Sequence, residues 1–139
     1  MRILGLDVGT VRIGVAQSDP MEILASATEV IKRTTPERDA ARVVELVKNL
    51  GAKRIVVGMP LQMNGEEGLS AKMVRDFVAV LQPKLPDDVE IVYQDERLST
   101  VSAQRMLIEA DMRREKRKNV VDKIAATIIL QNHLDKPKR

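Results

Sequence analysis

Short apolar runs joined by tight turns open the chain, and this pattern restricts the fold more than any other feature of the sequence. The runs cover residues 2–7, 12–18 and 23–32, and the turns between them contain Gly9-Thr10 and Asp19-Pro20. Runs of this length are typical of buried strands, and these dipeptides are typical of turns. Strands connected this closely pair antiparallel. The sequence therefore predicts a three-strand antiparallel meander at the start of the chain.

The rest of the chain alternates helical and strand patterns. We expect first a helix capped by Thr34 or Thr35 and ended by Gly51, followed by a strand over 54–59. A helix from Ser70 to about Gln82 and a strand over 90–94 come next. A helix from Ser99 or Thr100 to about Ala110 and a last helix over about 118–134 complete the chain. The order βββαβαβαα implies an α/β fold. It combines the meander with two parallel strands in a mixed five-stranded sheet that has helices on both faces. One domain is expected to span residues 1–139.

The chain has no cysteine and a single histidine, His133. Disulfides, thiolate nucleophiles and cysteine-based zinc sites are therefore excluded, and a Ser-His-Asp triad would depend on His133 alone. An enzyme of this composition must use carboxylates, lysines, hydroxyls or a bound metal. No stretch is long enough to span a membrane, and the first residues do not resemble a signal peptide. We therefore expect a cytoplasmic protein with no membrane partner.

Carboxylates occur where two predicted strands end. Asp7 ends the first strand, and Asp95 and Glu96 end the fifth. Sites in open α/β sheets lie beyond the carboxyl ends of the parallel strands, which makes these residues candidates. The simpler interpretation is that acidic residues only mark strand ends. The pattern by itself does not choose between Asp95 and Glu96.

A third carboxylate, Asp122, begins an apolar helical stripe. Ala125, Ala126 and Ile129 follow it at helical spacing, so a carboxylate at this position is at odds with a solvated face. The alternative is an acidic residue in the first turn of a helix, where the helix dipole favours it. Three converging carboxylates would repel one another unless a cation neutralised them. Oxygen ligands favour one or two Mg²⁺ or Mn²⁺ ions, which can activate water and stabilise a transferring phosphoryl group.

Basic residues are concentrated near the end of the chain. The formal charge is only +3, but residues 113–118 contain five basic side chains and residues 136–139 contain three. Phe77 and Tyr93 are the only aromatic residues, so stacking on unpaired bases has little support. A nucleic-acid partner would therefore be held mainly through its backbone and shape. The alternative for 113–118 is a solvated connection between helices.

Four segments together resemble the YqgF/RuvX family, and the resemblance covers essentially the whole chain. They read GLDVGTVRIGVA at 5–16, VGMPLQMNG at 57–65, DERLST at 95–100 and DKIAA at 122–126. The resemblance implies an RNase H-like fold and an activity as a pre-16S rRNA nuclease or a Holliday junction resolvase. It selects Glu96 over Asp95 and implies that Asp7, Glu96 and Asp122 are both catalytic and metal-binding. Val11 departs from the pattern, because members often carry a basic residue there.

The predicted substrate contacts come from these motifs and from the basic run. They are Arg12, Asn64, Arg97, Thr100, Arg113, Arg114, Arg117 and Lys118. Ser99 and Thr100 have a simpler alternative as helix caps. The expected partner is pre-rRNA or branched DNA, with ribosomal precursor particles as a further partner, and both a monomer and a homodimer remain open.

Three functions compete with processing of the 5′ end of pre-16S rRNA. A Holliday junction resolvase would use the same metal chemistry and would act as a symmetric dimer. A non-catalytic nucleic-acid-binding assembly factor would not need the carboxylates. An actin- or sugar-kinase-like ATPase shares the Asp7-Val8-Gly9-Thr10 turn, but it needs two such lobes, and this chain supplies only one.

Overall fold

The structure is a computed structural model of the chain that describes residues 1–62, 64–96 and 114–136, with side chains from Ile124 onward in the last segment. Its elements are β1 (Arg2–Val8), β2 (Arg12–Ser18), β3 (Ala25–Lys32), α1 (Pro36–Leu50), β4 (Ala52–Met59), α2 (Leu69–Leu81), a short 3-10 helix η1 (Gln82–Lys84), β5 (Glu90–Asp95) and α4 (Arg114–Leu134). The helix predicted from Ser99 or Thr100 lies outside the described residues. Across 1–62, 64–96 and 114–136, no helix is long and apolar enough to cross a membrane.

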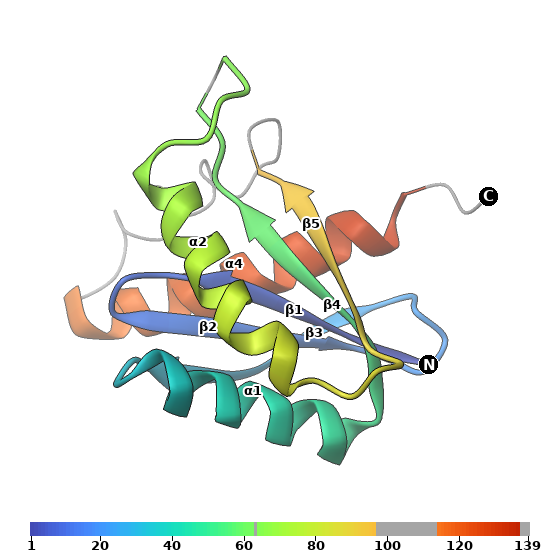
Figure 1. The fold of residues 1–139 in the computed structure, drawn as a ribbon. Coiled ribbons are helices and arrows are strands. Elements are labelled where there is room, and N and C mark those ends of the chain that lie inside the picture. Colours follow the sequence, from blue (N-terminus) through green and yellow to red (C-terminus); the bar gives the residue numbers. More distant parts are fainter. Residues whose placement is uncertain (63, 97–113, 137–139) are drawn as a thin grey trace.

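The five strands form one mixed sheet in the order β3-β2-β1-β4-β5. The β1–β2 and β2–β3 pairs are antiparallel, whereas the β1–β4 and β4–β5 pairs are parallel. The predicted meander and the two added parallel strands are therefore confirmed. Because β1, β4 and β5 run in the same direction, their carboxyl ends lie at one edge of the sheet (Figure 1).

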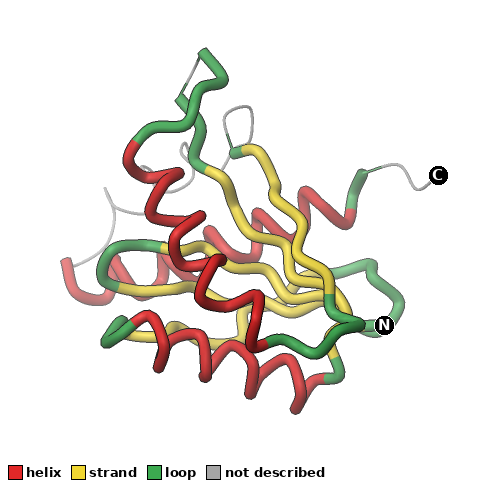
Figure 2. The backbone as a smooth tube through the Cα atoms, in the orientation of Figure 1, coloured by secondary structure: helices red, strands yellow, loops and turns green. Residues whose placement is uncertain are grey.

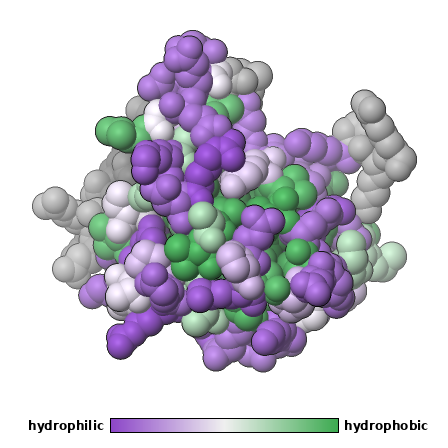
Figure 3. Space-filling view, viewed as in Figure 1, coloured by the Kyte–Doolittle hydropathy of each residue, from purple (hydrophilic) through white to green (hydrophobic). Residues whose placement is uncertain are grey.

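Helices cover both faces of the sheet, with α1 and α2 on one face and α4 on the other (Figures 1 and 2). The larger core lies under α1 and α2 and includes Leu4, Leu6 and Phe77. Apolar side chains gather in the middle of this face, and hydrophilic side chains surround them (Figure 3). The smaller core joins Ile129 and other residues of α4 to Ile3 and its neighbours on the sheet.

The ends of α1 show how local sequence defines an element. Thr35 is extended, and its hydroxyl accepts a hydrogen bond from the Arg38 backbone N–H at 3.2 Å. Pro36 follows, where its missing N–H costs nothing. Gly51 ends the helix in the left-handed region with φ of 66°, which suits a residue without a Cβ.

Several predicted boundaries were wrong, among them the start of β4, which is Ala52 rather than residue 54. Helix α2 begins at Leu69 with Gly68 at the cap position, so Ser70 lies inside the first turn. Strand β3 begins at Ala25 rather than at residue 23, because the Asp19 carboxylate accepts hydrogen bonds from the N–H groups of residues 23 and 24 and keeps them in the turn. Helix α4 begins at Arg114, so most of the basic run is helical.

Candidate active site

The candidate site lies at the carboxyl ends of β1, β4 and β5. Leu6 of β1 pairs with Val57 of β4, so Asp7 and Gly58 are the next residues on those two strands. Gly58 in turn pairs with Gln94 of β5. The predicted strand-end carboxylates therefore lie on the two strands that flank β4.

Asp7 belongs to the face of the sheet that α4 covers. Along β1, Leu4 and Leu6 pack into the core under α1 and α2, whereas Ile3 packs against α4. A Cβ added at Gly5 would stand 2.7 Å from the Leu130 Cβ of α4, so the helix passes very close to the strand here. Strand side chains alternate between faces, which puts Asp7 on the α4 face, where it is partly buried.

Glu96 reaches the same face from β5. Its backbone N–H donates to the Met59 carbonyl at 3.2 Å and continues the strand ladder. Its carboxylate lies over Gly58, where an added Cβ would be 2.5 Å from Oε1 of Glu96 and 2.5 Å from Cδ1 of Ile129. Oε1 is buried. Asp95, by contrast, is exposed, and as the neighbouring residue on the strand it points to the opposite face.

Asp122 lies in α4, and its side chain is outside the described set. By helical spacing its position precedes Ala125, Ala126 and Ile129, all of which are buried beneath the helix. Among the residues with described side chains, no group of three His, Asp or Glu residues is arranged as a metal site. Because the Asp122 side chain lies outside these residues, the convergence of Asp7, Glu96 and Asp122 stays a prediction.

Arg12 and Asn64 differ in their surroundings. Arg12 begins β2 next to the β1–β2 turn, is partly buried, and its carbonyl accepts from the Gly9 N–H at 2.8 Å. Asn64 is exposed in the loop after β4, where its Oδ1 accepts from the Glu66 N–H at 2.9 Å. Asn64 thus has a local role in shaping its own turn. Arg97, Thr100 and Arg113 lie outside the described residues, and Arg114, Arg117 and Lys118 lie in the first turns of α4.

Residues 1–136 match the family described as "RuvX: Holliday junction resolvase". This chain belongs to the RuvX family. It is 49% identical over 135 residues to a protein of Desulforamulus reducens, with 97% of each chain covered, and 50% identical over 135 residues to one of Halothermothrix orenii, with 97% and 95% covered. Both relatives carry the name "Putative pre-16S rRNA nuclease". The family predicted from the sequence is therefore confirmed.

Two solved structures share the fold. The structure of Thermus thermophilus RuvC with a Holliday junction substrate has a TM-score of 0.56 at 15% identity, and it covers 99% of this chain and 98% of its own. The fowlpox virus Holliday junction resolvase has a TM-score of 0.57 at 11% identity, with 97% and 99% covered. Similarity at this level of identity concerns the fold, and it confirms the predicted RNase H-like architecture.

Sequence reasoning missed three residues, namely Gly58 within this RuvX-family site and the pair Arg33 and Asp39 on the α1 and α2 side of the sheet. Gly58 was part of a quoted motif but was given no role, although its lack of a Cβ leaves the space that the Glu96 carboxylate occupies. Arg33 and Asp39 form an ion pair at 3.2 Å, and the Asp39 side chain is only 2% exposed. The one available signal was the acidic residue at position 39, next to Ala40 on the buried side of α1.

Proposed function

We propose that this chain is a metal-dependent nuclease that hydrolyses phosphodiester bonds and processes the 5′ end of pre-16S rRNA. The observation that carries the proposal is that Asp7 and Glu96 flank Gly58 on the α4 face, at the carboxyl ends of their strands. The names of the relatives support RNA as the substrate. The whole of residues 1–139 would act as one nuclease domain in the cytoplasm, on free pre-rRNA or on ribosomal precursor particles.

The donor chemistry suits a hard divalent cation. Asp7 and Glu96 offer only oxygen ligands, and the Glu96 carboxylate lies over Gly58 at the ends of the parallel strands. Asp7, Glu96 and Asp122 would hold one or two Mg²⁺ or Mn²⁺ ions. When bound, such ions activate water and neutralise charge on the phosphoryl group. The chain itself orients the carboxylates through the strand ends and through packing against α4.

Basic and polar side chains around this edge would hold the substrate. Arg12 lies beside the β1–β2 turn, and the first turns of α4 carry a dense positive charge. The proposed contacts are those predicted from the sequence, namely Arg12, Asn64, Arg97, Thr100, Arg113, Arg114, Arg117 and Lys118. Contacts to phosphates position a nucleic acid without reading its sequence.

The variant Asp7→Asn tests the catalytic proposal. Asn keeps the shape of Asp but loses the charge that binds a hard cation. We expect the variant to fold at least as stably as the parent without metal, because one of three clustered negative charges is gone. It should lose nearly all cleavage of pre-16S rRNA, and Mn²⁺ should raise its melting temperature less than that of the parent.

Asp95→Asn is the matched control, because it neutralises a strand-end carboxylate that is exposed and lies on the other face. The control should cleave like the parent. Parental cleavage by Asp7→Asn would show the metal-nuclease mechanism to be wrong. Loss of activity that merely follows unfolding would make Asp7 a structural residue.

A second candidate is cleavage of branched DNA, which the description of the matched family favours. Pre-16S rRNA and a four-way DNA junction should therefore be tested side by side, with Mn²⁺, Mg²⁺ and a chelator. Preferential cleavage of the junction would reverse our assignment of substrate. Metal-dependent cleavage of neither substrate, with retained RNA binding, would favour a non-catalytic assembly factor.

A further inference from the structure

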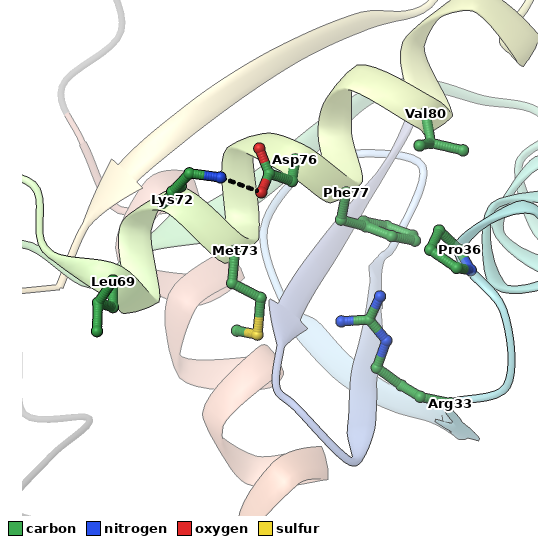
Figure 4. A pocket seen from close by; sticks show the side chains of 8 residues that line it. All are labelled: Arg33, Pro36, Leu69, Lys72, Met73, Asp76, Phe77 and Val80. Carbon is green, nitrogen blue, oxygen red and sulfur yellow. Dashed lines mark hydrogen bonds and ion pairs between the residues drawn. The ribbon is translucent and has the colours of Figure 1, made fainter.

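Arg33 joins three parts of the molecule on the face opposite to the candidate site. Its Nε donates to Oδ2 of Asp39 at 3.2 Å, and its Nη1 donates to the Gly9 carbonyl at 3.0 Å. Its guanidinium also lies 5.2 Å from the centre of the Phe77 ring of α2. Figure 4 shows the Arg33 side chain extending towards Phe77 and Pro36 along one wall of a groove of about 350 Å³.

The same residue holds the β1–β2 turn at two points. Besides the bond to the Gly9 carbonyl, the Arg33 backbone N–H donates to the Val11 carbonyl at 2.9 Å. The turn is closed from within by the Gly9 N–H, which donates to the Arg12 carbonyl at 2.8 Å. Gly9 comes two residues after Asp7, so Arg33 is bonded to the segment that directly follows the proposed metal ligand.

Asp39 fixes the Arg33 guanidinium in this position. It is 2% exposed, and its Oδ1 accepts hydrogen bonds from the backbone N–H and the hydroxyl of Thr34 at 3.1 and 3.3 Å. Among the residues that the structure describes, the three donors to this buried carboxylate come from residues 33 and 34. A buried ion pair contributes little net stability compared with apolar residues of similar size. The main effect of the Arg33–Asp39 pair is therefore to fix where the Arg33 guanidinium lies.

We propose that Arg33 is a positioning residue, which together with Asp39 holds the β1–β2 turn and thereby keeps Asp7 in the geometry that binds the metal. The proposal rests on the nuclease function proposed above. Arg33 acts from the α1 and α2 side of the sheet, so it can perform this role without contacting the substrate.

The test compares two double variants, each of which removes an arginine–carboxylate pair between α1 and β3 or the residue after it; Arg42 also pairs with Glu45 within α1. We call the Arg33–Asp39 pair and its hydrogen bond to the Gly9 carbonyl the clamp. Arg33→Met with Asp39→Asn removes the clamp, while the Asn still accepts from Thr34 and no buried charge is left unpaired. Arg42→Met with Glu29→Gln is the control, because Arg42 donates to both Glu29 oxygens, at 2.8 and 2.6 Å, and connects α1 to β3. The readouts are Mn²⁺ affinity by calorimetry, amide hydrogen exchange over residues 8–12 and melting temperature without metal.

We expect the clamp variant to bind Mn²⁺ about tenfold or more weakly, as when an outer-shell partner is removed from a metal site. Exchange over residues 8–12 should accelerate in this variant, and the control should match the parent in both respects. Mn²⁺ affinity and exchange equal to those of the control would overturn the proposal, whatever the change in melting temperature.

Arg33→Lys decides the matter if the double variant does not fold. Lysine keeps a positive charge beside Asp39 and Phe77, but it lacks the planar fork that reaches Asp39 and Gly9 together. It should fold and still weaken Mn²⁺ binding; parental affinity would refute the clamp. Asp7→Asn in the same titration separates the two proposals. If it binds Mn²⁺ like the parent, the metal site itself is wrong; if it loses Mn²⁺ and the clamp variants do not, only the clamp fails.

Discussion

At the scale of single residues, a substitution at Gly58 is predicted to affect cleavage much more than stability. An added Cβ would come within 2.5 Å of Glu96 Oε1 and Ile129 Cδ1, and both atoms end flexible side chains that can move aside. Alanine also restricts the unfolded chain more than glycine does. We therefore expect Gly58→Ala to change the free energy of unfolding by no more than about 1 kcal/mol. Cleavage should fall at least about tenfold, the equivalent of about 1.4 kcal/mol in transition-state stabilisation, because Glu96 is displaced.

Gly51→Ala provides the control for this prediction. No atom lies within 4 Å of a Cβ added at Gly51, but the residue has φ of 66°, so alanine is strained there. It should lose about 1–2 kcal/mol of stability, the cost of left-handed backbone, and keep parental cleavage. Urea unfolding and single-turnover cleavage measure the two effects. Full cleavage by a stable Gly58→Ala variant would mean that the orientation of Glu96 is unimportant.

At the scale of elements, α4 carries a pH-sensitive group near its end. Burial lowers the pKa of the His133 imidazole below its ordinary value, and the Arg54 cation lowers it further. The unfolded chain, with a histidine pKa of about 6.5, therefore takes up the proton more readily than the folded chain. Stability should fall as the pH drops below that value.

We expect the urea midpoint of the parent to decrease between pH 7 and pH 5.5, and that of His133→Gln to change much less. Glu29 and Glu67 also have lowered pKa values, first because of hydrogen bonds from Arg42 and Arg75. Their stabilising effect is lost only near and below the unfolded glutamate pKa of about 4.3, so it does not interfere in this window. Equal slopes for the parent and His133→Gln would contradict the assignment.

The elements also show which helix and strand boundaries can be predicted from sequence patterns. Periodicity and caps located α1 and the strands to within a few residues, because these signals are local. Helix α2 has no side-chain cap, so its start could not be read from a capping residue such as Ser70. The start of α4 was missed because the run from Arg114 to Lys118 has no apolar period, and a pattern method cannot distinguish it from a loop.

In the candidate site too, features set by neighbouring residues can be predicted from the sequence, whereas contacts between distant segments cannot. Asp7 and the pair Asp95 and Glu96 could be proposed from the sequence because strand ends are local features and parallel strands end together, whereas the choice of Glu96 over Asp95 came from the family resemblance. The space at Gly58 depends on α4, which lies about half the chain away. The contact from Arg33 to the Gly9 carbonyl depends on the fold of the first hairpin and α1. No pattern along the chain signals such contacts.

At the scale of the whole molecule, a net charge of +3 is too small to account for a polyanion partner by itself. What matters is where the charge lies. The first turns of α4 carry Arg114, Arg117 and Lys118, and this helix covers the face of the sheet on which Asp7 and Glu96 lie. The opposite face also has exposed basic residues, on α1 and η1, among them Arg38, Lys48 and Lys84. Two triple alanine variants, one for each set of three basic residues, therefore remove the same charge from different places and can be compared directly.

Affinity for duplex nucleic acid should fall steeply with salt, since each phosphate contact releases a counterion and contributes a slope of about one in log K against log salt. Replacing Arg114, Arg117 and Lys118 by alanine should reduce the slope by up to about three and weaken binding evenly across sequences. The triple variant of Arg38, Lys48 and Lys84 removes the same charge from the other face and should leave the slope nearly unchanged. Binding measured by anisotropy between low and moderate salt gives both slopes. If the two variants behave alike, only overall charge matters, and the basic turns of α4 are an ordinary solvated helix end.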